Sequence, residues 1–385
     1  MSWVSTTLSE VSVDGRGSYG IAASAVPKSE LLFTYLRITD IRDDGSLNKT
    51  GLQSVDAEGA AAYLLCPNDI VFARTGASTG RSYFYDGSDG ELVYAGFLIK
   101  FSLDPDKVFP RYIKYYCLSA RYRAWVAGHS VGSTRGNCNA SDFAAMPLFL
   151  PPLPVQRKIA DVLGAYDELI ENNRKRIALL EKMARELYRE RFVRRSRKGY
   201  PKALANFCTV QYGYAFNSKE FNAGGQGLPI VRIRNIPQGA STDYTTEKAP
   251  EEYIVHDGEL LVGMDGEFHI NLWSGGDAYL VQRSCCFRPY DESVKGFLME
   301  AIRAPIKYFE SSAMGATVGH LGKKDIDTIS LYEPTDEENA LFNEMYKERL
   351  SLSLQSRILA KQRDRLLPRL MSGKIDVEKL VKEGK

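Results

Sequence analysis

One loop in the first half of the chain combines glycines with residues that can bind nucleic acid. Its candidate contacts are Arg74, Thr75, Gly76, Ser78, Thr79 and Arg81. Glycines allow the backbone to approach DNA, hydroxyl and N–H groups can bind phosphate, and a guanidinium can donate two hydrogen bonds to O6 and N7 of guanine. A solvated hairpin turn would have the same composition, so the loop has both a DNA-binding and a plain structural interpretation.

Three further segments have a comparable composition. They contribute the candidate contacts Ser133, Thr134, Arg135 and Asn137 in the first half and His269, Asn271, Lys323 and Lys324 in the second half. Lysines can bind phosphate, whereas histidine and asparagine can contact base edges. The alternatives are an ordinary surface-loop histidine and a solvated lysine pair.

Arginines interrupt two otherwise apolar strand patterns at corresponding places in the two halves. Arg37 lies in the first pattern and Arg232 in the second. Each could contact DNA or could be a structural arginine paired inside its own domain. Arg234 and Asn235 favour DNA contact in the second half, because asparagine can pair with adenine through two hydrogen bonds.

The patterns of common catalytic centres are missing from the sequence. The segment nearest to a nucleotide-binding P-loop, residues 75–82, has Thr75 in place of the first glycine and Arg81 in place of the lysine. We find neither the Asn/Asp-Pro-Pro-aromatic motif of an adenine methyltransferase nor the clustered carboxylates and lysine of a nuclease. The four histidines and six cysteines show no metal-ligand spacing. We therefore expect no catalytic residue, metal or cofactor in this chain.

Charge is distributed unevenly along the 385 residues, although the net charge is only +2. Residues 155–199 hold 13 basic and 7 acidic residues, whereas residues 200–336 hold 12 basic and 18 acidic. DNA contacts would therefore come from local basic loops and segments, including the arginines after residue 188, and not from bulk charge. No apolar run is long enough for a membrane span, and the N-terminus lacks a secretory signal, so we expect a cytoplasmic protein with reduced cysteines.

Two long helices are predicted by heptad patterns. In the first, over residues 155–192, the apolar seam runs through Ile159, Leu163, Tyr166, Ile170, Ile177, Leu180, Ala184 and Leu187, with Asn173 midway. In the second, which begins after Pro334 with Thr335 or Asp336 as its N-cap, the seam residues are Met345, Leu352, Leu359 and Leu366, while Arg349, Ser356 and Arg363 make its middle polar. Pro368 is expected to end or kink this helix near Leu366. Each helix needs a partner, and the other helix is the simplest one.

The two halves also form a repeat. Residues 36–41 resemble residues 231–236, residues 69–72 resemble 259–262, and residues 142–148 resemble 325–331, each time in the same order. We predict an α+β fold with two globular domains, residues 1–154 and 200–334, joined by two long helices that form an antiparallel coiled coil within residues 155–199 and 335–385. The repeat predicts a pseudo-twofold relation between the halves.

Several motifs, in this order, resemble the specificity subunits of Type I restriction–modification enzymes. They are Gly132-Ser133-Thr134-Arg135, Ser141-Asp142-Phe143, Leu150-Pro151-Pro152-Leu153-Pro154, Gln156-Arg157-Lys158-Ile159-Ala160 and a closing segment at residues 366–375. Residues 211–216 are similar to the opening of a recognition domain. The second half departs from the pattern, with Glu333-Pro334 where the first half has Pro-Pro-Leu-Pro.

The resemblance implies a non-catalytic, sequence-specific DNA-binding subunit. In this family each recognition domain reads one half of a split double-stranded DNA target, and the helix pair sets the spacing between the halves. The resemblance further implies two methyltransferase subunits holding S-adenosylmethionine, and endonuclease subunits using ATP and Mg²⁺. Partner helices could dock on the outward face of the first long helix, at Glu171, Arg174, Glu181, Lys182 and Arg185, although a solvated face is the plain alternative. A protein-binding scaffold without DNA affinity is the alternative function.

Overall fold

The computed structural model describes residues 3–129, 137–197, 199–312, 319–375 and 377. The chain divides into two compact units, one formed by residues 1–167 with 362–385 and the other by residues 168–361. Each long helix is therefore shared between the units, and each unit is described separately below.

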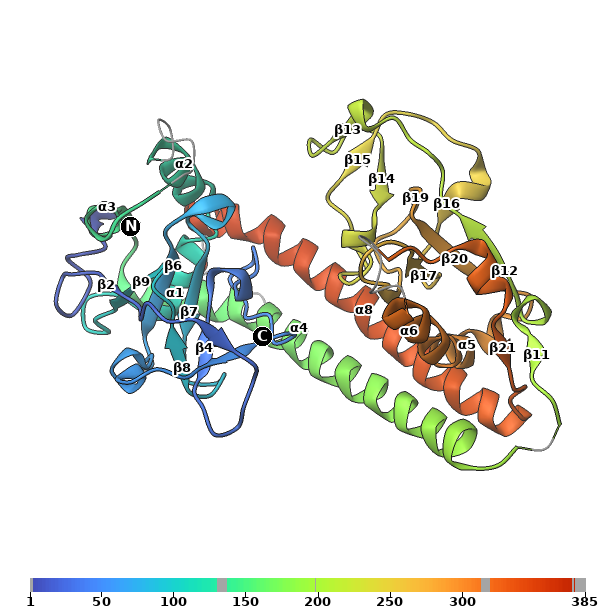
Figure 1. Cartoon of the computed structure of the whole chain (residues 1–385). Helices are drawn as coiled ribbons and strands as arrows, with labels where there is room; N and C mark the ends of the chain where they lie inside the picture. The colour runs from blue at the N-terminus through green and yellow to red at the C-terminus, as the bar shows by residue number, and fades with distance from the viewer. Residues whose placement is uncertain (1–2, 130–136, 198, 313–318, 376, 378–385) are drawn as a thin grey trace. The chain divides into compact units, whose positions relative to one another are not determined.

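The first unit contains two small sheets (Figure 1). One has the order β2-β9-β6-β7 with antiparallel neighbours, and its strands are β2 (Ser18–Tyr19), β6 (Asp69–Ala73), β7 (Ser82–Tyr85) and β9 (Leu98–Ser102). The other has the order β3-β5-β4-β8, with strands β3 (Ala25–Val26), β4 (Thr34–Leu36), β5 (Gln53–Val55) and β8 (Leu92–Tyr94). Strand β6 is buried along its whole length, as its β-branched and aromatic residues predict.

Helices and a short ladder complete this unit. They are α1 (Pro110–Tyr116), α2 (Ala120–His129) and α3 (Ala140–Ala144), with β1 (Val4–Thr7) paired to β10 (Pro147–Leu150). The main core joins Phe72 and Phe101 of the first sheet to Ile159 and Leu163 of the first long helix and to Leu370 of the second. The long helices are thus part of the core of this unit.

The second unit repeats the same plan. Its first sheet, β12-β20-β17-β18, consists of β12 (Cys208–Tyr212), β17 (Leu260–Gly263), β18 (Ile270–Leu272) and β20 (Ser284–Pro289). Its second sheet, β13-β15-β14-β19-β16, consists of β13 (Phe221–Asn222), β14 (Leu228–Val231), β15 (Tyr244–Thr245), β16 (Ile254–Val255) and β19 (Ala278–Leu280). The remaining elements are α5 (Lys295–Ala301), α6 (Arg303–Ser312), α7 (Lys323–Asp327), β11 (Lys202–Ala203) and β21 (Ser330–Leu331).

Two details of the pairing confirm the repeat that the sequence predicts. The parallel pair β4–β8 of the first unit corresponds to the parallel pair β14–β19 of the second. Gly20 and Gly213 also occupy equivalent close approaches, because a Cβ atom on either would lie 2.3 Å from Ala95 O or 2.1 Å from Val281 O. Only glycine fits where the backbones approach so closely.

The two long helices are α4 (Leu153–Tyr188) and α8 (Asp336–Met371), each of 36 residues. A π-helical segment, Arg189–Arg194, follows α4. Thr335 caps α8 as predicted: its Oγ1 accepts from Glu338 N at 3.2 Å, and its N–H donates to the Glu338 carboxylate at 2.9 Å. The prediction for Pro368 was wrong in one respect, because α8 continues through it to Met371. Pro368 lies in the last turn, where the missing N–H costs one hydrogen bond and leaves little helix to disrupt.

Polar pairs recur every seven residues along α8 where α4 and α8 run antiparallel. They are Arg349 with Glu181 (2.8 Å), Ser356 with Asn173 (3.3 Å) and Arg363 with Asp167 (2.8 Å). The first two pairs lie in the second unit and the last in the first unit. The seam of α4 is confirmed around them, since Ile159, Leu163, Ile170, Asn173 and Ala184 are all buried.

The Arg363 ion pair lies in the first unit, where Asp167 also accepts from Lys114 Nζ at 2.6 Å and Tyr115 Oη at 2.9 Å. Arg363 is only 7% exposed in its side chain and Asp167 15%. Burial raises the pKa of Asp167, but Lys114 and Arg363 outweigh that effect and hold the pKa below its usual value. The carboxylate is therefore ionised and depends on its cations.

Replacing Arg363 should destabilise the first unit. We expect Arg363→Ala to lower the free energy of unfolding by about 3 kcal/mol, because a buried carboxylate loses a partner. Arg365→Ala, at an exposed position of the same helix, should change it by less than about 0.5 kcal/mol. Urea denaturation at neutral pH measures both values, and equal effects would contradict the role assigned to the pair. Since the folded pKa is lowered, the stabilisation is present above about pH 4 and is lost as the pH falls through the folded value.

Candidate nucleic-acid interface

Three segments of the first unit meet at Arg74, at the end of strand β6. The Arg74 N–H donates to Phe97 O at 3.1 Å, and Cys138 N donates to Arg74 O at 3.0 Å. Thr75 and Asn137 form an isolated antiparallel bridge beside these bonds. The β6–β7 loop, the β8–β9 turn and the segment before α3 are thus joined through their backbones, which brings together two segments that the sequence singled out separately.

The second unit repeats this junction at Met264. The Met264 N–H donates to Arg283 O at 2.9 Å, and Leu321 N donates to Met264 O at 2.7 Å. Asp265 and His320 form the equivalent bridge. The backbone arrangement is the same in both units, whereas the side chains that it presents are different.

The glycine-rich loop of the first unit is built around two left-handed glycines. Gly76 has φ +72° with open space around its α-carbon, while Gly80 has φ +85° and lies against Val126. Thr79 Oγ1 donates to Gly76 O at 2.8 Å and closes the turn. Arg81 is ion-paired with Asp43 at 2.7 Å, so part of its hydrogen-bonding capacity is used within the unit. Gly76 is where another backbone or a phosphate could approach most closely.

Arg74 has a different environment from Arg81. Its guanidinium carbon lies 5.1 Å from the centre of the Tyr19 ring, a cation–π arrangement that positions the side chain. Its buried Nε has no hydrogen-bond partner among the described residues. A buried donor without a partner carries a free-energy cost, and in the described part of the chain this arginine is held at the junction without the internal ion pair that Arg81 has.

The structure places Arg37 and Arg232 at the caps of short 3₁₀ helices, so the expectation that they lie inside strands was wrong. Strands β4 and β14 end one residue earlier. The carboxylate of Asp40 accepts from Arg37 N at 2.9 Å, and the amide oxygen of Asn235 accepts from Arg232 N at 2.9 Å. These side-chain hydrogen bonds turn the chain out of the strand direction.

The side chains of these predicted contacts have partners within their own unit. Arg37 forms an ion pair with Asp40 at 2.8 Å and also donates to Gln53. Arg234 is 61% exposed and paired with Asp243 at 2.7 Å. Arg232 lies over the ring of Phe221, 5.7 Å from its centre. Arg234 is thus the most accessible of the three arginines.

Asn271 and His269 in the second unit also differ from one another. Asn271 donates to Ile236 O at 2.8 Å and to Pro237 O at 2.9 Å, and it accepts from Arg349 at 2.6 Å. These bonds tie strand β18 to a loop and to α8, which is a structural role that sequence reasoning missed. His269 is 29% exposed and lies 3.6 Å from Glu267.

The other predicted contacts outside the glycine-rich loop are two lysines and a segment of the first unit. Lys323 and Lys324 are exposed at the start of α7. Ser133, Thr134 and Arg135 lie outside the described residues.

The acidic residue of the Asp-Phe-like motif has a clear local role in both units. Asp142 accepts from Asn139 N at 2.8 Å at the start of α3, and Asp325 accepts from Gly322 N at 2.8 Å at the start of α7. Each carboxylate thus caps a helix and fixes the chain directly after the junction. Gln156 of the helix motif is likewise structural: it accepts from Phe109 N at 2.9 Å and donates to Pro151 O at 2.8 Å.

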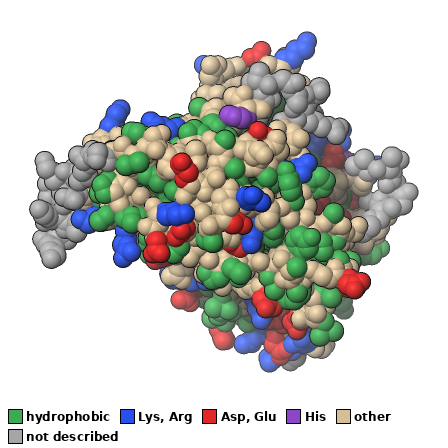
Figure 2. All heavy atoms as spheres, turned by 90° about the vertical axis from the view of Figure 1, so that its left-hand side faces the viewer, with side chains coloured by type: hydrophobic (Ala, Val, Ile, Leu, Met, Phe, Trp, Pro, Cys, Tyr) green, Lys and Arg blue, Asp and Glu red, His purple; other side chains and the backbone are tan. Residues whose placement is uncertain are grey.

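Surface charge does not by itself mark the interface. On the face drawn in Figure 2, basic, acidic and apolar side chains are interspersed over the described residues. Several arginines after residue 188 are paired locally, including Arg189 with Glu186 and Arg197 with Glu338. DNA contact would therefore depend on individual loops, as the charge distribution of the sequence indicates.

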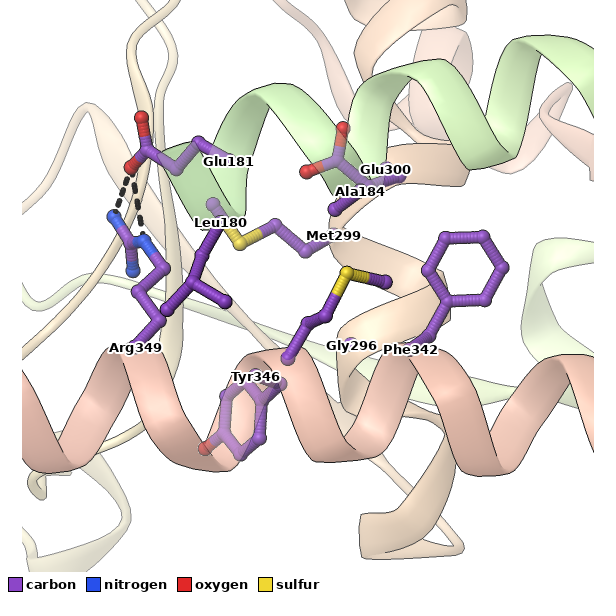
Figure 3. Close-up of a pocket in the computed structure, with 10 residues that line it drawn as sticks. Leu180, Glu181, Ala184, Gly296, Met299, Glu300, Phe342, Tyr346 and Arg349 are labelled. Atoms are coloured by element: carbon purple, nitrogen blue, oxygen red, sulfur yellow. Dashed lines mark hydrogen bonds and ion pairs between the residues drawn. The ribbon is translucent and has the colours of Figure 1, made fainter. Parts of the chain in front are cut away.

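One candidate for small-molecule binding among the described residues is an open cavity of about 570 Å³ in the first unit, lined by Thr7, Arg16, Ser141 and neighbouring residues. No group of three or more His, Cys, Asp or Glu among them could hold a metal ion. A cavity between α4, α5 and α8 in the second unit has a volume of about 20 Å³, enough for about one water molecule (Figure 3). Cys285 and Cys286 lie inside strand β20, and burial raises the pKa of both thiols. No helix in the described ranges is long and apolar enough to cross a membrane.

A family model described as the Type I restriction modification DNA specificity domain matches residues 39–182 and again residues 201–348. The chain belongs to this family. The assignment confirms the prediction of a specificity subunit without a catalytic role of its own. The two matches also coincide with the repeat seen in the fold.

Individual relatives agree with the family. The EcoBI specificity subunit of Escherichia coli is 30% identical over 141 residues, which cover 36% of this chain and 30% of the relative. The MjaIX specificity subunit of Methanocaldococcus jannaschii is 24% identical over 71% of each chain. The crystal structure of the S subunit from M. genitalium superposes with a TM-score of 0.52 at 16% identity, covering 96% of both chains, and shows the same fold.

One of the residues predicted on the outward face of α4 lies elsewhere in the structure. Glu181 was expected there, but it turns toward α8 and pairs with Arg349 (Figure 3). Glu171 and Arg174 lie 3.8 Å apart, Arg185 lies 3.9 Å from Glu181, and Lys182 is exposed. Sequence reasoning missed three exposed apolar residues on the same helix, Leu169 (51%), Leu179 (58%) and Met183 (50%).

We expect Arg37→Ala to reduce the stability of the first unit. Asp40 is only 3% exposed, and losing its guanidinium partner should cost about 1–3 kcal/mol. Lys107→Ala removes a half-exposed cation that pairs with Asp104 across one turn, and it should change the stability by less than about 0.5 kcal/mol. Thermal unfolding of both variants is the measurement, and an unaltered melting temperature for Arg37→Ala would contradict the structural assignment.

Proposed function

We propose that the chain binds an asymmetric, bipartite DNA target, with each unit reading one half-site, and that it performs no chemistry itself. One observation carries the proposal. The two junctions share their backbone hydrogen bonds but present Arg74, Thr75 and Asn137 in one unit and Asp265 and His320 in the other. The same scaffold with different side chains would read different bases.

The contacts proposed in the first unit are Arg74, Thr75, Gly76, Ser78, Thr79, Arg81, Ser133, Thr134, Arg135 and Asn137. In the second unit they are Arg232, Arg234, Asn235, His269, Lys323 and Lys324, while Arg37 and Asn271 contribute mainly by holding loops in place. Helix α4 connects the two domains in the sequence, and we propose that its length sets the spacing between the half-sites. The catalytic partners would be two methyltransferase subunits with S-adenosylmethionine and endonuclease subunits with ATP and Mg²⁺, in the cytoplasm.

The exposed apolar residues of α4 would contribute to the docking of those partners. At about 3.6 residues per turn, Leu169, Leu179 and Met183 share one exposed flank of α4, whereas Glu171, Arg174, Lys182 and Arg185 lie on the other flank. Exposed apolar residues that share one face are typical of a protein-interaction site. We assign the apolar flank of α4 to a methyltransferase subunit.

The test of DNA reading is methylome mapping with the chain and its cognate methyltransferase. Arg74→Ala should relax base preference at one position of one half-site, because a lost base contact costs about 1–3 kcal/mol. The other half-site should be unchanged. Lys107→Ala serves as the charge-matched control and should leave the target intact. Changed preference in both half-sites would refute domain independence. A complete lack of DNA affinity, with salt-insensitive protein binding, would favour the scaffold instead.

The docking face is tested by Leu179→Glu. A carboxylate at the centre of an apolar contact should weaken binding of the methyltransferase subunit by at least about tenfold, since burying a leucine contributes about 1.5–3 kcal/mol. Ala178→Glu places the same charge at a neighbouring exposed position and should have a smaller effect. Calorimetric titration of the purified subunits decides between them, and equal affinities for Leu179→Glu and the unaltered chain would exclude this face.

A further inference from the structure

Asp265 of the second unit holds two exposed hydrogen-bond donors at the junction. Its Oδ2 lies 2.5 Å from Arg283 Nη1, and its Oδ1 lies 2.5 Å from His320 Nδ1. The carboxylate is 20% exposed, whereas the side chains of Arg283 and His320 are 59% and 52% exposed. A partly buried carboxylate therefore orients two side chains that reach the solvent.

The backbone of Arg283 is in a conformation that favours glycine. Its φ is +72°, and Asn68 is the only other non-glycine residue in the described part of the chain with a positive φ. A long side chain in this left-handed region costs about 1 kcal/mol relative to glycine. An arginine in this conformation points to a contribution of the side chain that the turn itself does not require.

The corresponding positions of the first unit have entirely different chemistry. Phe97 occupies the position of Arg283, because each carbonyl accepts from the residue at the centre of its junction. Thr75 and Asn137 stand where the second unit has Asp265 and His320. Phe97 is 59% exposed and carries no donor. The charged group is therefore a feature of the second unit, and the common fold does not demand it.

We propose that Arg283 and His320, both oriented by Asp265, read bases in the second half-site. Arg283 would donate to O6 and N7 of a guanine with the edge of its guanidinium that faces away from Asp265. Because Asp265 accepts from Nδ1 of His320, Nε2 is the ring nitrogen left to contact a base. That atom would form a hydrogen bond with the edge of the adjacent base pair. Asp265 is the positioning residue for both.

This inference rests on the proposed DNA-binding function and adds two residues that no sequence motif marked. Arg283 lies in an ordinary turn between β19 and β20, and His320 follows a segment outside the described residues. Neither belongs to the glycine-rich loop. Only the folded backbone brings them to Asp265.

The decisive variant is Arg283→Gly, because glycine suits the backbone conformation. We expect its melting temperature to be no lower than that of the unaltered chain, while preference for guanine at one position of the second half-site falls about tenfold or more. Arg283→Lys keeps the charge but loses the forked geometry, so it should also lose the guanine preference while retaining affinity for DNA in general. His320→Ala should relax the neighbouring position. Asp265→Ala should relax both positions.

The readout is a library of targets randomised in both half-sites, selected by methylation with the assembled methyltransferase. Lys202→Ala, which removes an exposed cation paired with Glu333, is the control and should leave the selected sequences unchanged. Unaltered selection by Arg283→Gly and His320→Ala would overturn the inference. Uniformly weaker methylation of all sequences would also overturn it, because it would assign both residues to phosphate. If the unaltered chain selected no sequence at all, the proposed function itself would fail.

Discussion

Two backbone hydrogen bonds at a single residue hold together the junction of three segments in each unit. At Arg74 and at Met264, the N–H bonds to the turn between two strands and the carbonyl accepts from the segment before a short helix. These bonds involve no side chain. The geometry of the junction is therefore largely independent of the residues it displays, which allows the displayed residues to differ while the loops stay in register. The proposal that the two units read different half-sites depends on this independence of backbone and side chains.

The sequence predicted the parts of the fold that have a period or a repeated order. Heptad spacing located both long helices, and the order of short similarities located the two copies of the domain. The glycine-rich loop at residues 74–82 was recognisable because its glycines and hydroxyls are adjacent in the chain. The prediction that Pro368 ends the second long helix was wrong, since one missing hydrogen bond in the last turn does not end a helix that is held by its packing.

Partnerships between residues distant in sequence were not predictable in the same way. Asn271 was a plausible base contact until Arg349, 78 residues away, was found to donate to it. Arg37 similarly resembled a DNA contact, but its guanidinium donates to Gln53, 16 residues away, as well as to the nearby Asp40. His320 and Arg283 show the opposite case: they have no motif, yet the fold gathers them at Asp265. In each case the function of a polar side chain depends on which partners use its hydrogen bonds.

The polar pairs between α4 and α8 determine how the two helices align with one another. An apolar seam would bury more surface, but it would tolerate a shift by one heptad, because leucines at equivalent positions are interchangeable. Arg349, Ser356 and Arg363 recur every seven residues and meet Glu181, Asn173 and Asp167, which differ from one another in charge and length. A one-heptad slip would place Arg363 opposite Asn173, and it would leave Asp167 without a helix partner. Unpaired buried charge is costly, so these pairs favour one register of the two helices, as the spacing role proposed for α4 would require.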